Sequence, residues 1–205
     1  MLKNCRGRER LGWVVVLSAT LAISSALTHA RQAPPTLGLP RVPLAAPCLV
    51  PGNAYLRARI RGAVRLDIDL HGPQISCEGG PRFDGSGLRM GFEGRVAPGG
   101  RRVRMVFGID GAREGRSGRE LPTNLTVIFE GERQIFATQG DGNCTVDTLR
   151  QKRIGGGGRP TRTYLITAHG FCVAPANDLG GKRRILVTTF DFAGRADFGN
   201  QGAVL

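Results

Sequence analysis

The sequence predicts an exported all-β protein, an antiparallel β-sandwich that contains disulfide bonds. Three observations predict it: apolar and polar residues alternate over several stretches, glycine-rich turns separate these stretches, and four cysteines follow an apolar N-terminal segment. Many short strands joined by such turns are typical of sandwiches and barrels, and a barrel is the alternative here. No pattern after residue 30 has the period of an amphipathic helix.

The first thirty residues have the three-part layout of a secretory signal peptide. A basic head that includes Lys3 precedes an apolar run from Leu11 to Leu27, and small residues end the segment at Ala30. We therefore predict that residues 1–30 are removed during export. An uncleaved anchor is the alternative, although the run is short for crossing a bilayer. No later stretch approaches that length, so we expect no transmembrane segment in the mature chain.

The rest of the chain divides by composition into two parts. Residues 31–47 contain five prolines and are expected to be an extended lead-in. Residues 48–205 are one domain in size, and we expect a single β-sandwich domain there. The expected location of the mature protein is the periplasm or the extracellular space.

Four cysteines remain after the predicted signal peptide: Cys48, Cys77, Cys144 and Cys172. An even number in an exported chain predicts disulfides, and the spacing lacks the C-x-x-C pairs of metal and redox sites. Folding the chain about position 158, within a glycine run, places Cys144 opposite Cys172. Opposed residues in antiparallel strands have Cα atoms about 4.5–5.5 Å apart, which suits a disulfide. We favour that pair over the other two connectivities, which leaves Cys48 with Cys77.

The clearest strand pattern covers Leu56–Leu70, where even positions are mostly apolar and odd positions are mostly arginine or aspartate. Such alternation predicts a strand with one buried and one wet face. The stretch exceeds the usual strand length of about 3–10 residues, so we expect a bend or bulge at Gly62. Shorter alternating runs at 88–92, 103–109 and 125–129 predict further strands. The run from Arg184 to Phe192 begins apolar on both faces, which indicates a central strand.

The chain is strongly basic, with 29 Lys and Arg residues against 16 Asp and Glu residues and a net charge of +13. Arginine suits bidentate contacts with carboxylate and phosphate. The candidate anion-binding residues lie on the long predicted strand and at the beginnings of two others: Arg57, Arg59, Arg61, Arg65, Arg101, Arg102, Arg104, Lys182, Arg183 and Arg184. The alternative is ordinary cross-strand pairing with acidic neighbours, which contributes little.

Two further basic groups lie in predicted connections. The long loop after Ile109 carries Arg113, Arg116 and Arg119, and loops of that length are more often functional or disordered. The glycine run at 155–158 is flanked by basic residues, but no Gly-Lys-Ser/Thr follows it, so a phosphate-binding P-loop is excluded.

The residues needed for catalysis are scarce. After residue 30 the chain has three serines and two histidines, and no serine lies in a G-x-S-x-G turn. Tyr55 and Tyr164 are the two tyrosines, and Trp13 lies in the predicted signal peptide. This shortage of aromatic rings disfavours stacking platforms for sugars and single-stranded nucleic acid, and no nucleic-acid partner is expected.

The sequence therefore predicts an exported, non-catalytic binding protein without a cofactor or metal. Its expected partner is an anionic cell-envelope component: an acidic polysaccharide, a phosphorylated glycolipid or an acidic protein. Two alternatives stay open. One is a structural or interaction domain whose charge is incidental, and the other is a hydrolase with an unrecognised site.

Overall fold

A computed structural model of the chain describes residues 48, 53–155 and 161–199. The predicted signal peptide (1–30) and the proline-rich segment (31–47) lie outside these residues, so both stay predictions. Within the described residues, no helix has the length and apolar character needed to cross a membrane.

The described residues form eleven strands and two short 3-10 turns. In chain order these are β1 (Tyr55–Gly62), β2 (Leu66–His71), η1 (Gly72–Gln74), β3 (Ile75–Pro81), β4 (Gly87–Val96), β5 (Arg101–Asp110), β6 (Gly118–Glu130), β7 (Gln134–Ala137), η2 (Asp141–Asn143), β8 (Cys144–Gly155), β9 (Arg162–Cys172), β10 (Ala176–Asp178) and β11 (Arg184–Phe198).

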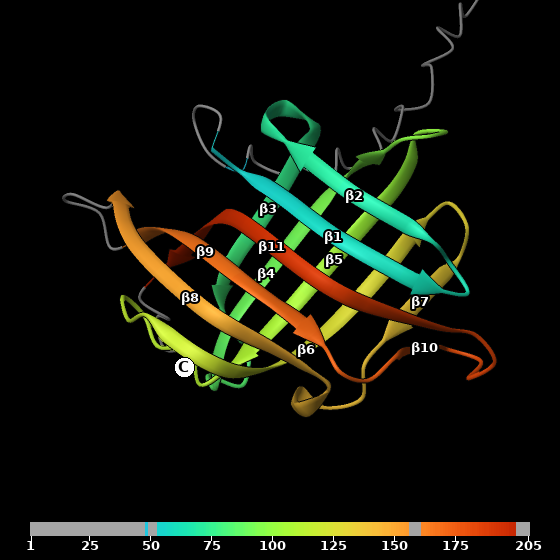
Figure 1. Cartoon of the computed structure of the whole chain (residues 1–205). Coiled ribbons are helices and arrows are strands. Elements are labelled where there is room, and N and C mark those ends of the chain that lie inside the picture. Colours follow the sequence, from blue (N-terminus) through green and yellow to red (C-terminus); the bar gives the residue numbers. More distant parts are fainter. Residues whose placement is uncertain (1–47, 49–52, 156–160, 200–205) are drawn as a thin grey trace, which may run out of the picture. The chain divides into compact units, whose positions relative to one another are not determined.

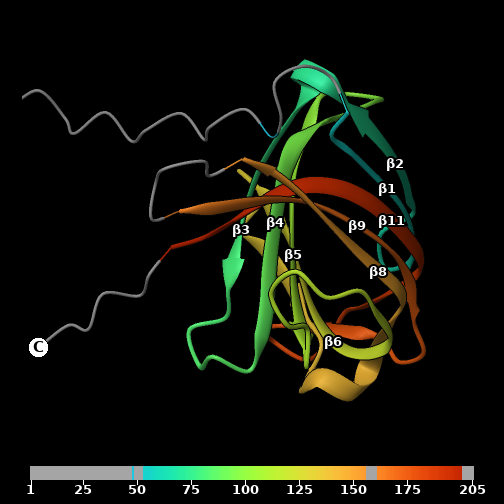
Figure 2. The same cartoon turned by 90° about the vertical axis from the view of Figure 1, so that its left-hand side faces the viewer.

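All strand pairs are antiparallel, and their hydrogen bonds join the eleven strands into one sheet. The main order is β2-β1-β11-β10-β7-β6-β5-β4-β3, while β8 and β9 connect β6 to β11 by a second route. This second route partly closes the sheet into a ring. In Figure 1, β2, β1, β11, β9 and β8 lie in front of β3–β7 and cross them. Figure 2 shows the front strands from the side.

The all-β, antiparallel prediction is confirmed, but the strands do not separate into two independent sheets. The cause is the length of β6 and β11, which have 13 and 15 residues. Each pairs with different neighbours along its length, so it belongs to both groups of strands. β11 pairs with β1 on one side and with β9 and β10 on the other, which confirms the prediction of a central strand.

The core lies between the front and rear strands, and phenylalanines pack at its centre among buried aliphatic side chains. The Phe107 ring centroid, on β5, lies 4.8 Å from that of Phe192 on β11, and Phe92 on β4 lies 4.9 Å from Phe192. Gly194 permits this approach, since a Cβ there would be 2.8 Å from the Phe92 ring. Burying such large apolar rings is the main stabilising contribution to a fold of this kind.

The long strand expected over Leu56–Leu70 is instead a hairpin, and this prediction was wrong in its topology. Gly62 has a φ of 111° and ends β1, and the chain reverses before β2 begins. A Cβ at Gly62 would lie 2.6 Å from the carbonyl oxygen of Arg184, so glycine is required there. The alternation survives because even positions pair with even positions, as in Leu56 opposite Leu70.

Both disulfides are present with the predicted connectivity, Cys48–Cys77 and Cys144–Cys172. Cys144 is directly opposite Cys172 in the β8–β9 ladder, as folding about position 158 predicts. Two irregularities further along β8 then shift the register, which residue spacing alone does not reveal. Two disulfides indicate an oxidising, extracytoplasmic environment.

Candidate functional site

The arginines of β1 point outward and face aspartates of β2. The hairpin places Arg57 opposite Asp69, and Arg59 opposite Asp67. The Arg57 Nε donates a hydrogen bond to Asp69 Oδ1 at 3.1 Å. The Arg61 Nη1 donates one to Asp67 Oδ1 at 2.6 Å, and this hydrogen bond lowers the pKa of Asp67. The predicted arginine stripe is therefore neutralised in part by its own hairpin.

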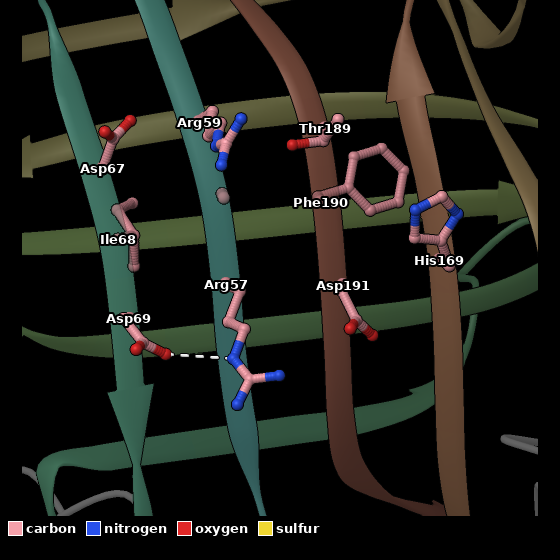
Figure 3. A pocket seen from close by; sticks show the side chains of 10 residues that line it. Arg57, Arg59, Asp67, Ile68, Asp69, His169, Thr189, Phe190 and Asp191 are labelled. Atoms are coloured by element: carbon pink, nitrogen blue, oxygen red, sulfur yellow. Dashed lines mark hydrogen bonds and ion pairs between the residues drawn. The ribbon is translucent and has the colours of Figure 1, made fainter.

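A groove of about 500 Å³ lies beside this stripe, on the outer face of β2, β1, β11 and β9. In Figure 3, Asp69, Arg57, Asp191 and His169 form a row that takes one side chain from each of these four strands. The register agrees, because Asp191 of β11 is opposite both Arg57 and His169. Hydrogen-bond donors and acceptors therefore alternate across the groove.

Tyr55 fixes the position of Asp191 in this row. Its hydroxyl donates a hydrogen bond to Asp191 Oδ1 at 2.9 Å. Burial and this hydrogen bond raise the pKa of Tyr55 to about 12. The Arg57 guanidinium lies over the same ring, 5.1 Å from its centroid, a distance at which a cation–π interaction is favourable.

The structure brings two predicted clusters together where β1 ends and β11 begins. The Ala63 nitrogen donates to the Arg184 carbonyl at 2.8 Å, and Arg183 Nη2 donates to the Ala63 carbonyl at 3.5 Å. Asp178 Oδ1 organises the β10–β11 turn by accepting bonds from the backbone nitrogens of Lys182 and Arg183, at 2.9 and 3.1 Å. We call the combined set the basic corner: Arg59, Arg61, Arg65, Lys182, Arg183 and Arg184.

The basic corner carries little compensating negative charge. Among the residues that the structure describes, Arg61 with Asp67 is the one ion pair that any member of the corner forms. Asp178 faces backbone nitrogens in the turn rather than a guanidinium. Most of the positive charge of the corner therefore has no acidic partner among the described residues.

The remaining candidates, Arg101, Arg102 and Arg104, lie on β5 among the rear strands. Arg104 Nη2 is 2.8 Å from Glu78 Oε1, and Arg101 Nε is 2.6 Å from Glu132 Oε1. Arg102 contacts two glutamates. We call the surface network of β3–β6 the paired ladder: Glu78, Arg89, Glu93, Arg102, Arg104 and Glu130.

Glu78 is the centre of the paired ladder, because it also accepts from Arg89 Nη1 at 3.0 Å. Burial alone would raise the pKa of Glu78, but the hydrogen bonds and charges of Arg89 and Arg104 prevail and lower it. The arginines of the paired ladder therefore form ordinary ion pairs with acidic residues of neighbouring strands, which is the alternative that the sequence left open.

Sequence reasoning missed the acidic half of the groove. Asp67 and Asp69 stand at odd positions of the same alternating run as Arg57 and Arg59, so a predicted turn at 63–65 would have found them. Asp191 is distant from β1 in sequence, and its place in the row depends on long-range strand pairing that no local pattern shows.

Across residues 48, 53–155 and 161–199, the structure has no group of three or more His, Cys, Asp or Glu side chains that could hold a metal ion. Comparisons with protein-family models, with curated proteins and with solved structures found no match to this chain.

Proposed function

We propose that this is an exported, non-catalytic binding protein that holds an anionic cell-envelope component through the basic corner and the adjoining groove. The observation that carries the proposal is the contrast between the corner and the paired ladder. Arg102 and Arg104 both have acidic partners. Of the described corner residues, Arg61 alone forms an ion pair, with Asp67. Arginines without intramolecular partners can form charge-assisted hydrogen bonds with a ligand.

The proposal includes export directed by residues 1–30 and a site of action in the periplasm or outside the cell. The two disulfides support it, since they form and persist in oxidising compartments. We also propose that the crossing front and rear strands act as a sandwich-like scaffold. Such a scaffold would hold the groove on rigid strands and reduce the cost of ordering it on binding.

Among the anionic ligands, we propose an acidic polysaccharide. The groove beside the corner places Asp67, Asp69 and Asp191 next to arginine side chains. Carboxylates accept hydrogen bonds from sugar hydroxyls, while guanidinium groups bind carboxylate or phosphate. An acidic polysaccharide carries both kinds of partner along one chain.

The same carboxylates argue against hydrolysis as the main function. The side chains of Asp67 and Asp69 are 65% and 62% exposed. A general acid at neutral pH needs a raised pKa, which burial or a nearby like charge supplies. The pKa of Asp67 is instead lowered, first by its hydrogen bond from Arg61.

Retention on immobilised polygalacturonate in a salt gradient tests the proposal. We expect the Arg65→Gln/Arg184→Gln variant to elute at clearly lower salt than the unmodified protein. The matched control, Arg95→Gln/Arg104→Gln, loses the same charge from the rear strands, and Glu78 keeps Arg89 as a partner. The control should elute close to the unmodified protein.

Two further arms separate the alternatives. Neutral dextran should not retain the protein, and vesicles with anionic headgroups should retain it less than polygalacturonate does. Stronger retention on vesicles would favour a phosphorylated glycolipid instead. Equal elution of the corner variant, the control and the unmodified protein would show that the charge of the corner is incidental.

A further inference from the structure

A second basic groove lies between the beginning of β6 and β8. It has a volume of about 380 Å³, and its lining includes Arg119, Arg150, Ser117 and Thr148. Two guanidinium groups and two hydroxyls therefore border one depression. None of these four residues belongs to the basic corner or to the groove beside it.

The loop that borders this groove is held in place by one glutamine of β8. The Gln151 amide nitrogen donates to the carbonyl oxygens of Arg113 and Arg116, at 2.8 and 2.9 Å. Its amide oxygen accepts from the Gly115 nitrogen at 3.0 Å. A loop fixed by three such bonds loses little conformational entropy when a ligand binds.

The acidic residue of the loop is already engaged. Glu114 accepts a hydrogen bond from Arg162 Nη2 at 2.9 Å, and the bonds from Arg162 are the largest cause of its lowered pKa. Glu120 is exposed and adjoins Arg119 in sequence. Within the residues that the structure describes, neither Arg119 nor Arg150 forms an ion pair with either glutamate or with any other acid.

The second groove adjoins the first through the strand register. Arg119 is opposite Thr148, and Thr148 is opposite His169. His169 lines the first groove. Residues opposite one another on neighbouring strands share a face and lie about 5 Å apart. One row of side chains therefore connects the two grooves across the front strands.

We propose that the groove of Arg119 and Arg150 is a second anion-binding site, which takes a sulfate or phosphate group carried on a saccharide. The planar guanidinium fork matches a tetrahedral oxyanion in a bidentate geometry, and the hydroxyls of Ser117 and Thr148 can donate to its remaining oxygens. The choice of a saccharide as the carrier rests on the proposed function. The anion site itself rests on the local geometry.

Titration with sucrose octasulfate, a compact sulfated saccharide, tests this proposal. Amide NMR shifts should map to residues 117–119 and 148–150. The Arg119→Gln/Arg150→Gln variant should bind with a Kd raised by about tenfold or more, because each lost charge-assisted bond is worth about that factor. The equally charged control Arg95→Gln/Arg104→Gln should keep the Kd of the unmodified protein.

Three outcomes would overturn the proposal: an unchanged Kd in the Arg119→Gln/Arg150→Gln variant, shifts confined to other strands, or equal binding of unsulfated sucrose. Inorganic sulfate bound as tightly as the octasulfate would assign the site to a free anion instead. The Arg65→Gln/Arg184→Gln variant separates the two proposals. It should elute from polygalacturonate at clearly lower salt than the unmodified protein, yet keep the octasulfate shifts at residues 117–119.

Discussion

The basic corner and the paired ladder are both rich in arginine, yet their neighbours differ. The ladder lies on strands, whereas the corner combines positions on β1 and β11 with the turns beside β2 and β11. On the rear strands, Arg102 of β5 is opposite Glu130 of β6, and Arg104 is opposite Glu93 of β4. In the corner, Arg184 of β11 is opposite Asn177 of β10, and Arg65, Lys182 and Arg183 lie in the turns beside β2 and β11. Residue type is therefore the same in the two regions, and the neighbouring side chains decide whether the positive charge is compensated.

The physical consequence is a division between compensated and uncompensated positive charge. The positive charges of the ladder are compensated by ion pairs within the molecule, and each exposed ion pair contributes about 0–1 kcal/mol to stability. Charge in the corner has mostly no internal partner, so it costs some self-repulsion and can attract an anion. Four predictions test this division, beginning with the largest expected effect.

A buried position and an outward position on β1 should respond very differently to the same substitution. Ile60→Asp places a carboxylate where the native side chain is fully buried, and should cost several kcal/mol of stability or prevent folding. Arg59→Asp on the wet face should lower the melting temperature far less, since its cost is repulsion from the exposed Asp67 opposite it, and it should weaken binding to polygalacturonate. Similar melting temperatures for the two variants would contradict the orientation of β1.

Removing the central acid of the ladder should destabilise the protein more than removing a corner arginine. Glu78→Gln leaves Arg89 and Arg104 without their shared partner, and should cost about 0.5–1 kcal/mol. Arg184→Gln removes no ion pair that the described residues form, so its free energy of unfolding should match that of the unmodified protein. Urea denaturation measures the free energy of unfolding of both variants. A larger loss of stability in Arg184→Gln than in Glu78→Gln would contradict the view that the ladder arginines are paired and the corner arginines are not.

The stabilising effect of Glu78 should depend on pH. Its pKa in the folded protein is lower than the ordinary value of 4.5. The stabilisation is therefore present above about pH 4.5 and is lost as the pH falls through the folded pKa. The stability difference between the unmodified protein and Glu78→Gln should shrink as the pH is lowered. A difference that stays constant down to pH 2 would show that charge is not its cause.

The fourth prediction concerns the groove beside the corner. Tyr55 should titrate at about 12 rather than 10.0, as measured by ultraviolet titration in a Tyr164→Phe background. Its stabilising contribution is present below pH 10 and is lost as the pH rises toward 12. Asp191→Asn should lower this pKa only in part, because burial is the larger cause. An unchanged Tyr55 pKa in Asp191→Asn would show that Asp191 is not a hydrogen-bond partner of Tyr55.

The sequence allowed strand positions and inward faces to be predicted, because period-two alternation reports burial directly. Cys144 opposite Cys172 was predictable because the two cysteines are equally distant in sequence from position 158 of the glycine run. The turn after Gly62 was missed because a hairpin that pairs even with even positions preserves the alternation of a single strand. The ring closure through β8 and β9 was missed because it depends on pairings between distant segments.

The arginines of the candidate site could be listed from the sequence, but which of them lie together in the fold could not. Nothing local indicates that Arg184 meets the end of β1, or that Arg102 faces Glu130 across neighbouring strands. These contacts are long-range, and they decide which arginines are neutralised. The second groove shows the same limit, because Arg119 and Arg150 converge only through the β6–β8 pairing.

The most direct test of the division between corner and ladder is NMR of the arginine side-chain Nε–Hε groups during titration with oligogalacturonate. The account predicts shifts for Arg59, Arg65 and Arg184, with little change for Arg89, Arg102 and Arg104. It also predicts that the shifts disappear at high salt, because the Debye length falls from about 10 Å at 0.1 M to about 3 Å at 1 M. Shifts confined to the ladder, or equal shifts in both regions, would contradict it.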